Sequence, residues 1–163
     1  MVINMEELTP KKVSESKTEQ IQILMPQHIN GYKRLFGGVL MEWIDVVAGV
    51  VARRHANSEV TTASVDNLQF KSPAYVNSTI ILIGKITYVG TTSMEVRVET
   101  FVESLSGERK LVNRAYVVMV ALDEHERPKR VPAVIPETEE EFAEFEAGKR
   151  RHDLRKQRRL ENY

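Results

Sequence analysis

A carboxylate lies near the middle of a long, largely apolar stretch in the first third of the chain. Asp45 lies within LFGGVLMEWIDVVAGVVARRHA, residues 35–56, which is apolar on nearly every side when drawn as a helix. A helix of that kind is normally buried, and a buried carboxylate must be paired, neutralised or used in chemistry. Such an acid could be a general base or a nucleophile. It could also simply accept a hydrogen bond from a neighbouring strand.

Helical spacing places small residues beside this acid. Ala48 and Gly49 follow Asp45 by three and four residues, and Ala52 continues the same stripe. Because a glycine inside a helix costs about 1 kcal/mol relative to alanine, a close approach by another group is one explanation, and ordinary packing is the other. The bulkier side chains are predicted on the opposite side, where they would fill the concave face of a sheet: Val39, Leu40, Trp43, Ile44, Val46, Val47, Val50 and Val51.

Two further features precede the expected helix. Gly37 and Gly38 would leave the first N–H groups of the helix uncovered, and such groups can stabilise an oxyanion. The same pair could equally be a tight turn. In the loop before them, His28 could act as a base and Asn30 could bind a carbonyl or a water molecule, although either residue is common in surface loops.

Several classes of function are excluded or disfavoured by composition. The chain has 163 residues, no cysteine and a formal net charge of zero, so thiolate chemistry and Cys-type metal sites are excluded. The four histidines have no metal-binding spacing, and there is no GxSxG or P-loop motif. We expect no nucleic-acid or membrane partner, and read the basic cluster KRRHDLRKQRR near the end as a solvated helix. The polar N-terminus has no signal-like apolar run, so a cytoplasmic protein is expected.

The periodicity predicts an α+β domain. A helix over roughly 38–55 precedes long segments that alternate with period two, and short turns between them indicate antiparallel neighbours. The alternation of residues 92–104 predicts one buried and one solvated face. The strands are expected at 19–25, 59–70, 78–89, 92–104 and 110–123. The simplest packing wraps a curved antiparallel sheet around the helix.

The two ends of the chain are predicted to be separate from this domain. Thr138 and Glu141 have the spacing of a capping box and would open a charged helix that lies on the surface. The expected division is a flexible N-terminus, a single domain and a charged C-terminal helix or tail, over residues 1–18, 19–136 and 137–163.

Taken together, several blocks resemble the hotdog-fold acyl-CoA thioesterases, in the acyl-CoA hydrolase branch. The resemblance runs in order from about residue 20 to about residue 150, through HINGYKRLFGGVLMEWIDVVAGVVARRH, VTTASVDNLQFKSP, VGTTSMEVRVE, NRAYVVMVALD and VPAVIPETEEE. It implies a hotdog fold, in which the sheet wraps a long central helix. It also implies a homo-oligomer, a dimer at minimum and a hexamer built as a trimer of dimers in the fullest form.

The resemblance also implies an activity and roles for single residues. The reaction would be hydrolysis of acyl-CoA to a carboxylic acid and free CoA, without a metal or other cofactor. Asp45 would be the general base or, less favoured, the nucleophile; Asn30 of the neighbouring subunit would orient the water or the carbonyl; and the Gly38 N–H would stabilise the oxyanion. Candidates for contacts with the substrate are Gly37, His28, Arg53, Arg54, His55, Lys71, Ser93 and Met94.

Two other functions fit the same fold. A non-catalytic protein that binds or senses acyl-CoA is the main alternative, because a fold does not determine a function. A hydratase or dehydratase is disfavoured, because His28 is the only histidine near the expected site in the sequence. The presence of both Asp45 and Asn30 favours hydrolysis.

Overall fold

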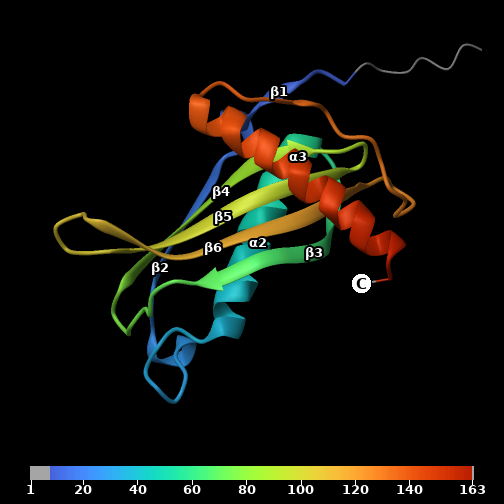
Figure 1. Cartoon of the computed structure of the whole chain (residues 1–163). Coiled ribbons are helices and arrows are strands. Elements are labelled where there is room, and N and C mark those ends of the chain that lie inside the picture. The colour runs from blue at the N-terminus through green and yellow to red at the C-terminus, as the bar shows by residue number, and fades with distance from the viewer. Residues whose placement is uncertain (1–7, 163) are drawn as a thin grey trace, which may run out of the picture.

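A five-stranded antiparallel sheet curves around one long helix in the computed structural model, which describes residues 8–162 (Figure 1). The strand order is β2-β4-β5-β6-β3, so β2 and β3 are the two edges. The strands are β2 (Thr18–Ile23), β3 (Glu59–Phe70), β4 (Thr79–Val89), β5 (Ser93–Glu103) and β6 (Arg109–Leu122). The predicted α+β fold, with its central helix and antiparallel sheet, is confirmed.

Helix α2 (Gly37–Ala56) lies across the concave face of this sheet. Leu40, Ile44, Val47 and Val51 are almost fully buried and form the core together with the inward-facing residues of the strands. The helix ends at Asn57, whose left-handed backbone conformation (φ 51°) caps the last turn. Hydrophobic burial against the sheet therefore fixes one face of α2.

The other face of α2 is exposed, which corrects the prediction of a helix buried all round. Asp45 and its neighbour Val46 are both exposed, and Val46 retains 52% of its accessible surface. Ala48 and Ala52 are instead fully buried against the sheet. The exposed positions recur at intervals of three and four residues, so they form one stripe that points away from the sheet. Asp45 is therefore a surface acid on a stripe that mixes apolar side chains, such as Met41 and Val46, with charged ones.

Helix α3 (Glu139–Leu160) covers the convex face of the sheet, which the sequence predicted to be solvated (Figure 1). As a result Glu95 is only 1% exposed and Arg97 only 6%. The capping box predicted from Thr138 and Glu141 is present, with Glu141 N–H donating to Thr138 Oγ1 at 3.2 Å. The helix continues to Leu160, so most of the predicted C-terminal segment 137–163 is one helix.

Short elements tie the N-terminal segment to the rest of the chain. They are β1 (Lys11–Lys12), α1 (Val13–Ser16), the 3-10 helix η1 (Pro26–His28) and β7 (Val134–Ile135). Strand β1 pairs in parallel with β7, and Val13 is buried in the core. Residues 8–18, which the sequence predicted to be flexible, thus include two ordered elements; residues 1–7 of that prediction lie outside the described residues.

Candidate active site

The Asp45 carboxylate is held by a residue of the edge strand β3. Thr62 Oγ1 donates a hydrogen bond of 2.6 Å to Asp45 Oδ1, and the same hydroxyl lies 3.4 Å from Met119 Sδ. The strand-to-helix hydrogen bond that the sequence left open is therefore present. Within residues 8–162, no hydrogen bond or ion pair uses Oδ2 of Asp45. One oxygen is oriented and the other is available to a ligand.

This acid lies beside an unpaired edge of the sheet. In the described part of the chain β3 pairs with β6 alone. Its exposed apolar residues include Val65 and Phe70, and the adjacent stripe of α2 adds Met41 and Val46. An exposed edge with apolar side chains is a template for pairing with another chain. The surroundings of Asp45 thus have the properties of an interface.

Asn30 is fixed in a turn that consumes its side-chain oxygen. Oδ1 accepts from the N–H groups of Tyr32 (2.9 Å) and Arg34 (3.3 Å). The backbone N–H of Asn30 also donates to the Arg34 carbonyl at 2.8 Å. Asparagine side chains commonly stabilise turns in this way. What remains is the amide Nδ2, so Asn30 can offer a donor to a carbonyl oxygen or a water molecule.

The start of α2 adds a second group of donors. Helix α2 begins at Gly37 with Phe36 as its N-cap, and no side chain caps it. Leu40 N–H is the first to bond within the helix, at 3.1 Å to the Phe36 carbonyl, so the preceding N–H groups have no intrahelical acceptor. A Cβ at Gly38 would lie 2.8 Å from the Phe36 ring, so ring packing also accounts for this glycine. The glycine pair is therefore compatible with a tight turn into the helix and with backbone N–H groups that bind a ligand.

A cavity of about 310 Å³ lies next to this helix start. Asn30 and Lys71 line it together with Leu40 at the first turn of α2 and Phe70 at the end of β3. The structure therefore brings Asn30, Lys71 and the N-terminus of α2 to one place. Asp45 is seven residues beyond Gly38, or roughly 10 Å along the helix axis. A single carbonyl group cannot contact both Gly38 and Asp45 of the same chain.

Two predicted substrate contacts, His55 and Met94, are corrected because both residues are fully buried. His55 Nε2 lies 2.9 Å from the Pro132 carbonyl oxygen, and burial lowers the pKa of the imidazole. Met94 is part of the hydrophobic core. We assign both residues to the core rather than to a ligand. His28 accepts a hydrogen bond from Met25 N–H at 3.0 Å and packs edge-on against Trp43, which supports the predicted core role of Trp43.

The remaining predicted contacts are spread over the molecule. Arg53 pairs with Glu59 at 2.6 Å, and Arg54 donates to Lys17 O and Thr18 Oγ1, so both cations are engaged near the C-terminal end of α2. Ser93 lines a different cavity on the convex face. Over residues 8–162, no cluster of His, Asp and Glu residues could hold a metal ion, and no helix is long and apolar enough to cross a membrane.

Thr62 is the site residue that the sequence analysis missed. Its residue type is ordinary for a strand, and nothing in the sequence alone places it opposite Asp45. Only the register of β3 against β6, in which Thr62 pairs with Met119, directs its hydroxyl toward α2.

Comparisons with known proteins agree with this architecture. Residues 32–106 match the family model described as thioesterase superfamily. An uncharacterized acyl-CoA thioester hydrolase of Bacillus subtilis (strain 168) is 40% identical over 89% of this chain and 85% of that protein. The human cytosolic acyl coenzyme A thioester hydrolase is 35% identical over 88% of this chain, which spans 38% of that protein.

Solved structures of acyl-CoA hydrolases and thioesterases are also similar to this chain. An acyl-CoA hydrolase from Staphylococcus aureus, in complex with butyryl coenzyme A, coenzyme A and coenzyme A disulfide, superposes with a TM-score of 0.89 at 35% identity, covering 94% of each chain. That enzyme has also been solved with an aspartate, an asparagine or a threonine replaced by alanine. An apo-hexameric acyl-CoA thioesterase superposes with a TM-score of 0.88 at 41% identity, over 91% of this chain and 97% of that one.

Proposed function

Because the chain belongs to the thioesterase superfamily, among the acyl-CoA thioester hydrolases, we propose that it hydrolyses acyl-CoA with Asp45 as the general base. The observation that carries this proposal is the exposed Asp45 carboxylate, oriented by Thr62 at 2.6 Å beside the unpaired edge of β3. A carboxylate with one oriented and one available oxygen can take a proton from water. The products are a carboxylic acid and free CoA.

Two copies of the chain complete the proposed site. Gly38 and Asp45 of one helix are too far apart to act on one carbonyl, so each site combines Asp45 of one subunit with the turn and helix start of the other. The unpaired edge of β3 and the exposed Met41 and Val46 of α2 supply the surface for that contact. We propose a dimer at minimum, and the hexameric relative supports a larger assembly of dimers.

The proposed reaction follows from these positions. Asp45 accepts a proton from a water molecule, and the hydroxide attacks the thioester carbonyl carbon. The Gly38 N–H of the other subunit stabilises the resulting oxyanion, and the Asn30 Nδ2 of that subunit donates to the carbonyl oxygen or holds the water. Collapse of the tetrahedral intermediate breaks the C–S bond, and the CoA thiolate recovers the proton from Asp45. These groups call for no cofactor. The proposed setting is the cytoplasm, as for the cytosolic mammalian relatives.

Replacement of Asp45 tests the assignment of the base. Asp45→Ala and Asp45→Asn should lower kcat by about a hundredfold or more, because general-base catalysis contributes on that order. Turnover is measured as CoA release with a thiol reagent, over a panel from acetyl-CoA to palmitoyl-CoA. Glu42→Gln is a matched control, since Glu42 is an exposed acid one turn earlier on the same helix.

Two results would contradict this proposal in different ways. Wild-type turnover by Asp45→Ala on every acyl-CoA would remove Asp45 from the mechanism. Tight binding of acyl-CoA by the wild-type protein without any release of CoA would instead favour the non-catalytic binding protein.

A further inference from the structure

A groove of about 920 Å³ lies between α3, the end of β4 and the segment that joins β6 to α3. Tyr88 lines it from β4, and Phe145 lines it from the first half of α3. Of its lining residues, only Thr91 also lines the cavity that contains Ser93. Because α3 covers one face of the sheet and α2 the other, the groove is separated by the sheet from Asp45 of the same chain (Figure 1). It is not part of the site described above.

Most of the groove is lined by apolar side chains that the fold holds in place. The rings of Tyr88 and Phe145 pack against each other, with their centroids 5.2 Å apart. Val131 and Val134 each retain only 8% of their accessible surface, because they also pack against the core. Leu8 adds an exposed apolar side chain. The groove therefore offers hydrocarbon surface to a ligand, and removal of such surface from water favours binding.

Two cationic side chains, Lys129 and Arg130, precede the apolar residues of the segment that lines the groove. Both are exposed. Within residues 8–162, no acid lines the groove, and neither cation makes an ion pair or a side-chain hydrogen bond. Two positive charges are therefore not neutralised, and they can attract an anion from solvent.

The backbone that carries these cations is held by the rest of the fold. Lys129 N–H donates to the Ala121 carbonyl at 2.8 Å, and Val131 N–H donates to the Thr91 carbonyl at 3.1 Å. The hydrogen bonds lie on both sides of Arg130 in the chain. A surface that is already ordered loses less conformational entropy when it binds a ligand.

This arrangement suits one anionic group attached to a hydrocarbon chain. The two cations are neighbours in the chain, so they can share one carboxylate through charge-assisted hydrogen bonds. The remaining lining is mostly apolar, so it can contact the hydrocarbon chain attached to that carboxylate. The volume of about 920 Å³ lies within the usual range for small-molecule sites.

We propose that this groove binds a free fatty acid, with the carboxylate at Lys129 and Arg130 and the hydrocarbon chain along Val131, Val134 and Phe145. A fatty acid is also a product of the proposed hydrolysis, but binding in the groove does not depend on that reaction. The groove is a second site for this ligand, on the face of the sheet opposite Asp45.

A charge-reversal pair tests the position of the carboxylate. Binding of decanoate is measured by titration calorimetry for the full chain and for Lys129→Glu/Arg130→Glu. Lys149→Glu/Arg150→Glu is the control, because it changes the net charge equally at exposed positions outside the groove. Decanoate binding should weaken at least about tenfold in the groove variant, since charge-assisted hydrogen bonds are lost, and change less than about twofold in the control.

A series of ligands tests the hydrocarbon contacts. From octanoate to decanoate to dodecanoate, affinity should rise at least about fourfold at each step, because each step buries two more CH₂ groups. The alcohol 1-octanol has the chain without the charge, so it should bind at least about tenfold more weakly than octanoate. Leu8→Ser removes apolar surface at an exposed position and should weaken dodecanoate binding by about threefold.

The outcomes separate this groove from the proposed active site. Decanoate affinity that is unchanged in Lys129→Glu/Arg130→Glu would place the ligand elsewhere and overturn the proposal, as would an equal loss in the control variant. An affinity that does not rise with chain length would overturn it as well. Asp45→Ala should bind decanoate in the groove as the wild type does, so calorimetry gives this answer whether or not the protein hydrolyses acyl-CoA.

Discussion

At the residue scale, Thr62 determines how Asp45 presents its carboxylate. The hydroxyl donates to Oδ1 at 2.6 Å from a strand whose register is fixed by its pairing with β6. This bond holds the carboxylate in one orientation and leaves Oδ2 without a hydrogen bond from residues 8–162. A general base must be within hydrogen-bond reach of the proton it removes, so its orientation matters as much as its basicity.

We expect Thr62→Val to lower kcat by about tenfold or more, because a hydrogen bond to a charged group contributes on the order of 1.5–3 kcal/mol. Thr62→Ser retains the hydroxyl and should remain near wild type. Thr61→Val is the control, since Thr61 is the neighbouring exposed residue on the same strand. Steady-state kcat with one acyl-CoA measures the effect. A Thr62→Ser variant as slow as Thr62→Val would show that the hydroxyl is not what matters.

Single residues were predictable where their type is unusual for its surroundings. Asp45 is an acid in an apolar stretch, and its selection needed only the sequence. Its exposure was not predictable, because the side of α2 that faces the sheet depends on packing. His55 was misassigned for a related reason: a histidine beside two arginines resembles a phosphate contact, whereas the last turn of α2 directs it into the core toward Pro132.

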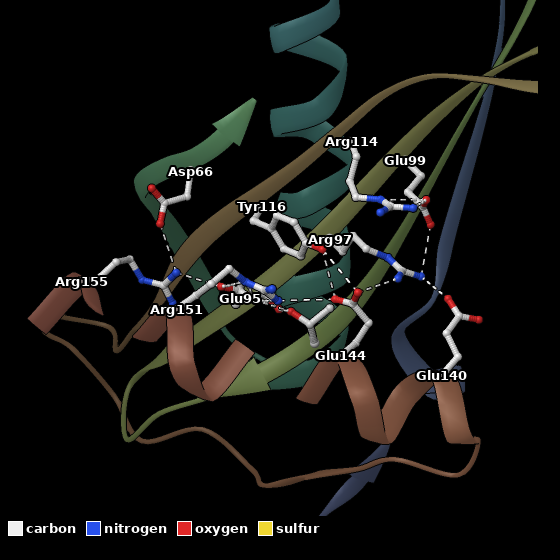
Figure 2. Close-up of polar contacts among 11 residues, drawn as sticks. Asp66, Glu95, Arg97, Glu99, Arg114, Tyr116, Glu140, Glu144, Arg151 and Arg155 are labelled. Carbon is white, nitrogen blue, oxygen red and sulfur yellow. Dashed lines mark hydrogen bonds and ion pairs between the residues drawn. The ribbon is translucent and has the colours of Figure 1, made fainter. Parts of the chain in front are cut away.

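At the scale of elements, α3 is attached to the sheet largely by charges. Glu95 receives hydrogen bonds from Thr87 at 2.7 Å and from Arg151 and Arg155, while Arg97 pairs with Glu140 at 2.7 Å (Figure 2). Buried charges of this kind are costly unless every partner is present. The attachment therefore depends on a close and exact approach of the helix to β4 and β5.

Gly148 permits that approach. A Cβ at this position would lie 2.7 Å from Tyr88 Cβ and 3.1 Å from Glu95 Oε1, so the helix would have to move away from the sheet. We expect Gly148→Ala to lower the free energy of unfolding by about 1–3 kcal/mol through overpacking. In an exposed helix the same change would stabilise by about 1 kcal/mol. Urea denaturation measures whether Gly148→Ala lowers or raises the free energy of unfolding.

The exposed position Glu146 on the same helix supplies the control for Gly148. Glu146→Ala removes a side chain without creating an overlap, so it should change the free energy of unfolding by less than about 0.5 kcal/mol. An increase in stability for Gly148→Ala would show that α3 is not held against β4 as the structure has it.

The long elements were predictable because each has a clear period. Helix α2 and the four long strands begin and end within one or two residues of the predicted bounds. The position of α3 was not predictable, because Glu95 and Arg97 alternate with apolar residues as solvated residues do. Their burial depends on matching charges at Glu140, Arg151 and Arg155, more than forty residues later in the chain.

At the scale of the whole molecule, stability should fall with acid in two steps. Burial lowers the pKa of His55 below its ordinary value of 6.5, so the unfolded chain binds the proton first, and stability is lost as the pH falls below 6.5. Burial raises the pKa of Glu95, but hydrogen bonds from Arg151 and Thr87 outweigh it, so the net pKa is below 4.5 and a second loss follows in that range.

Melting temperatures between pH 4 and pH 8 test the first step. His55→Gln should make the decline that begins near pH 6.5 shallower without abolishing it, because burial also lowers the pKa of His152. The same variant should have a lower melting temperature at pH 8, whereas His125→Gln, at an exposed histidine, should keep the full decline. If the melting temperature of His55→Gln falls with pH as steeply as that of the wild type, the decline belongs to other groups.

The proposed sharing of each site between two subunits makes a prediction that no single variant can test. Asp45→Ala and Asn30→Ala chains should each be nearly inactive as pure proteins. In a mixed dimer, one site combines both substitutions and the other contains intact Asp45 and intact Asn30. Random assembly of equal amounts makes roughly half of the dimers mixed, so co-expression or subunit exchange should restore roughly a quarter of wild-type activity. A site built within one chain would instead leave the mixture as inactive as its components, because each chain would lack one of its own two groups. The control is a mixture of Asp45→Ala with Asp45→Ala/Asn30→Ala, which has no intact pairing in either arrangement and must stay inactive.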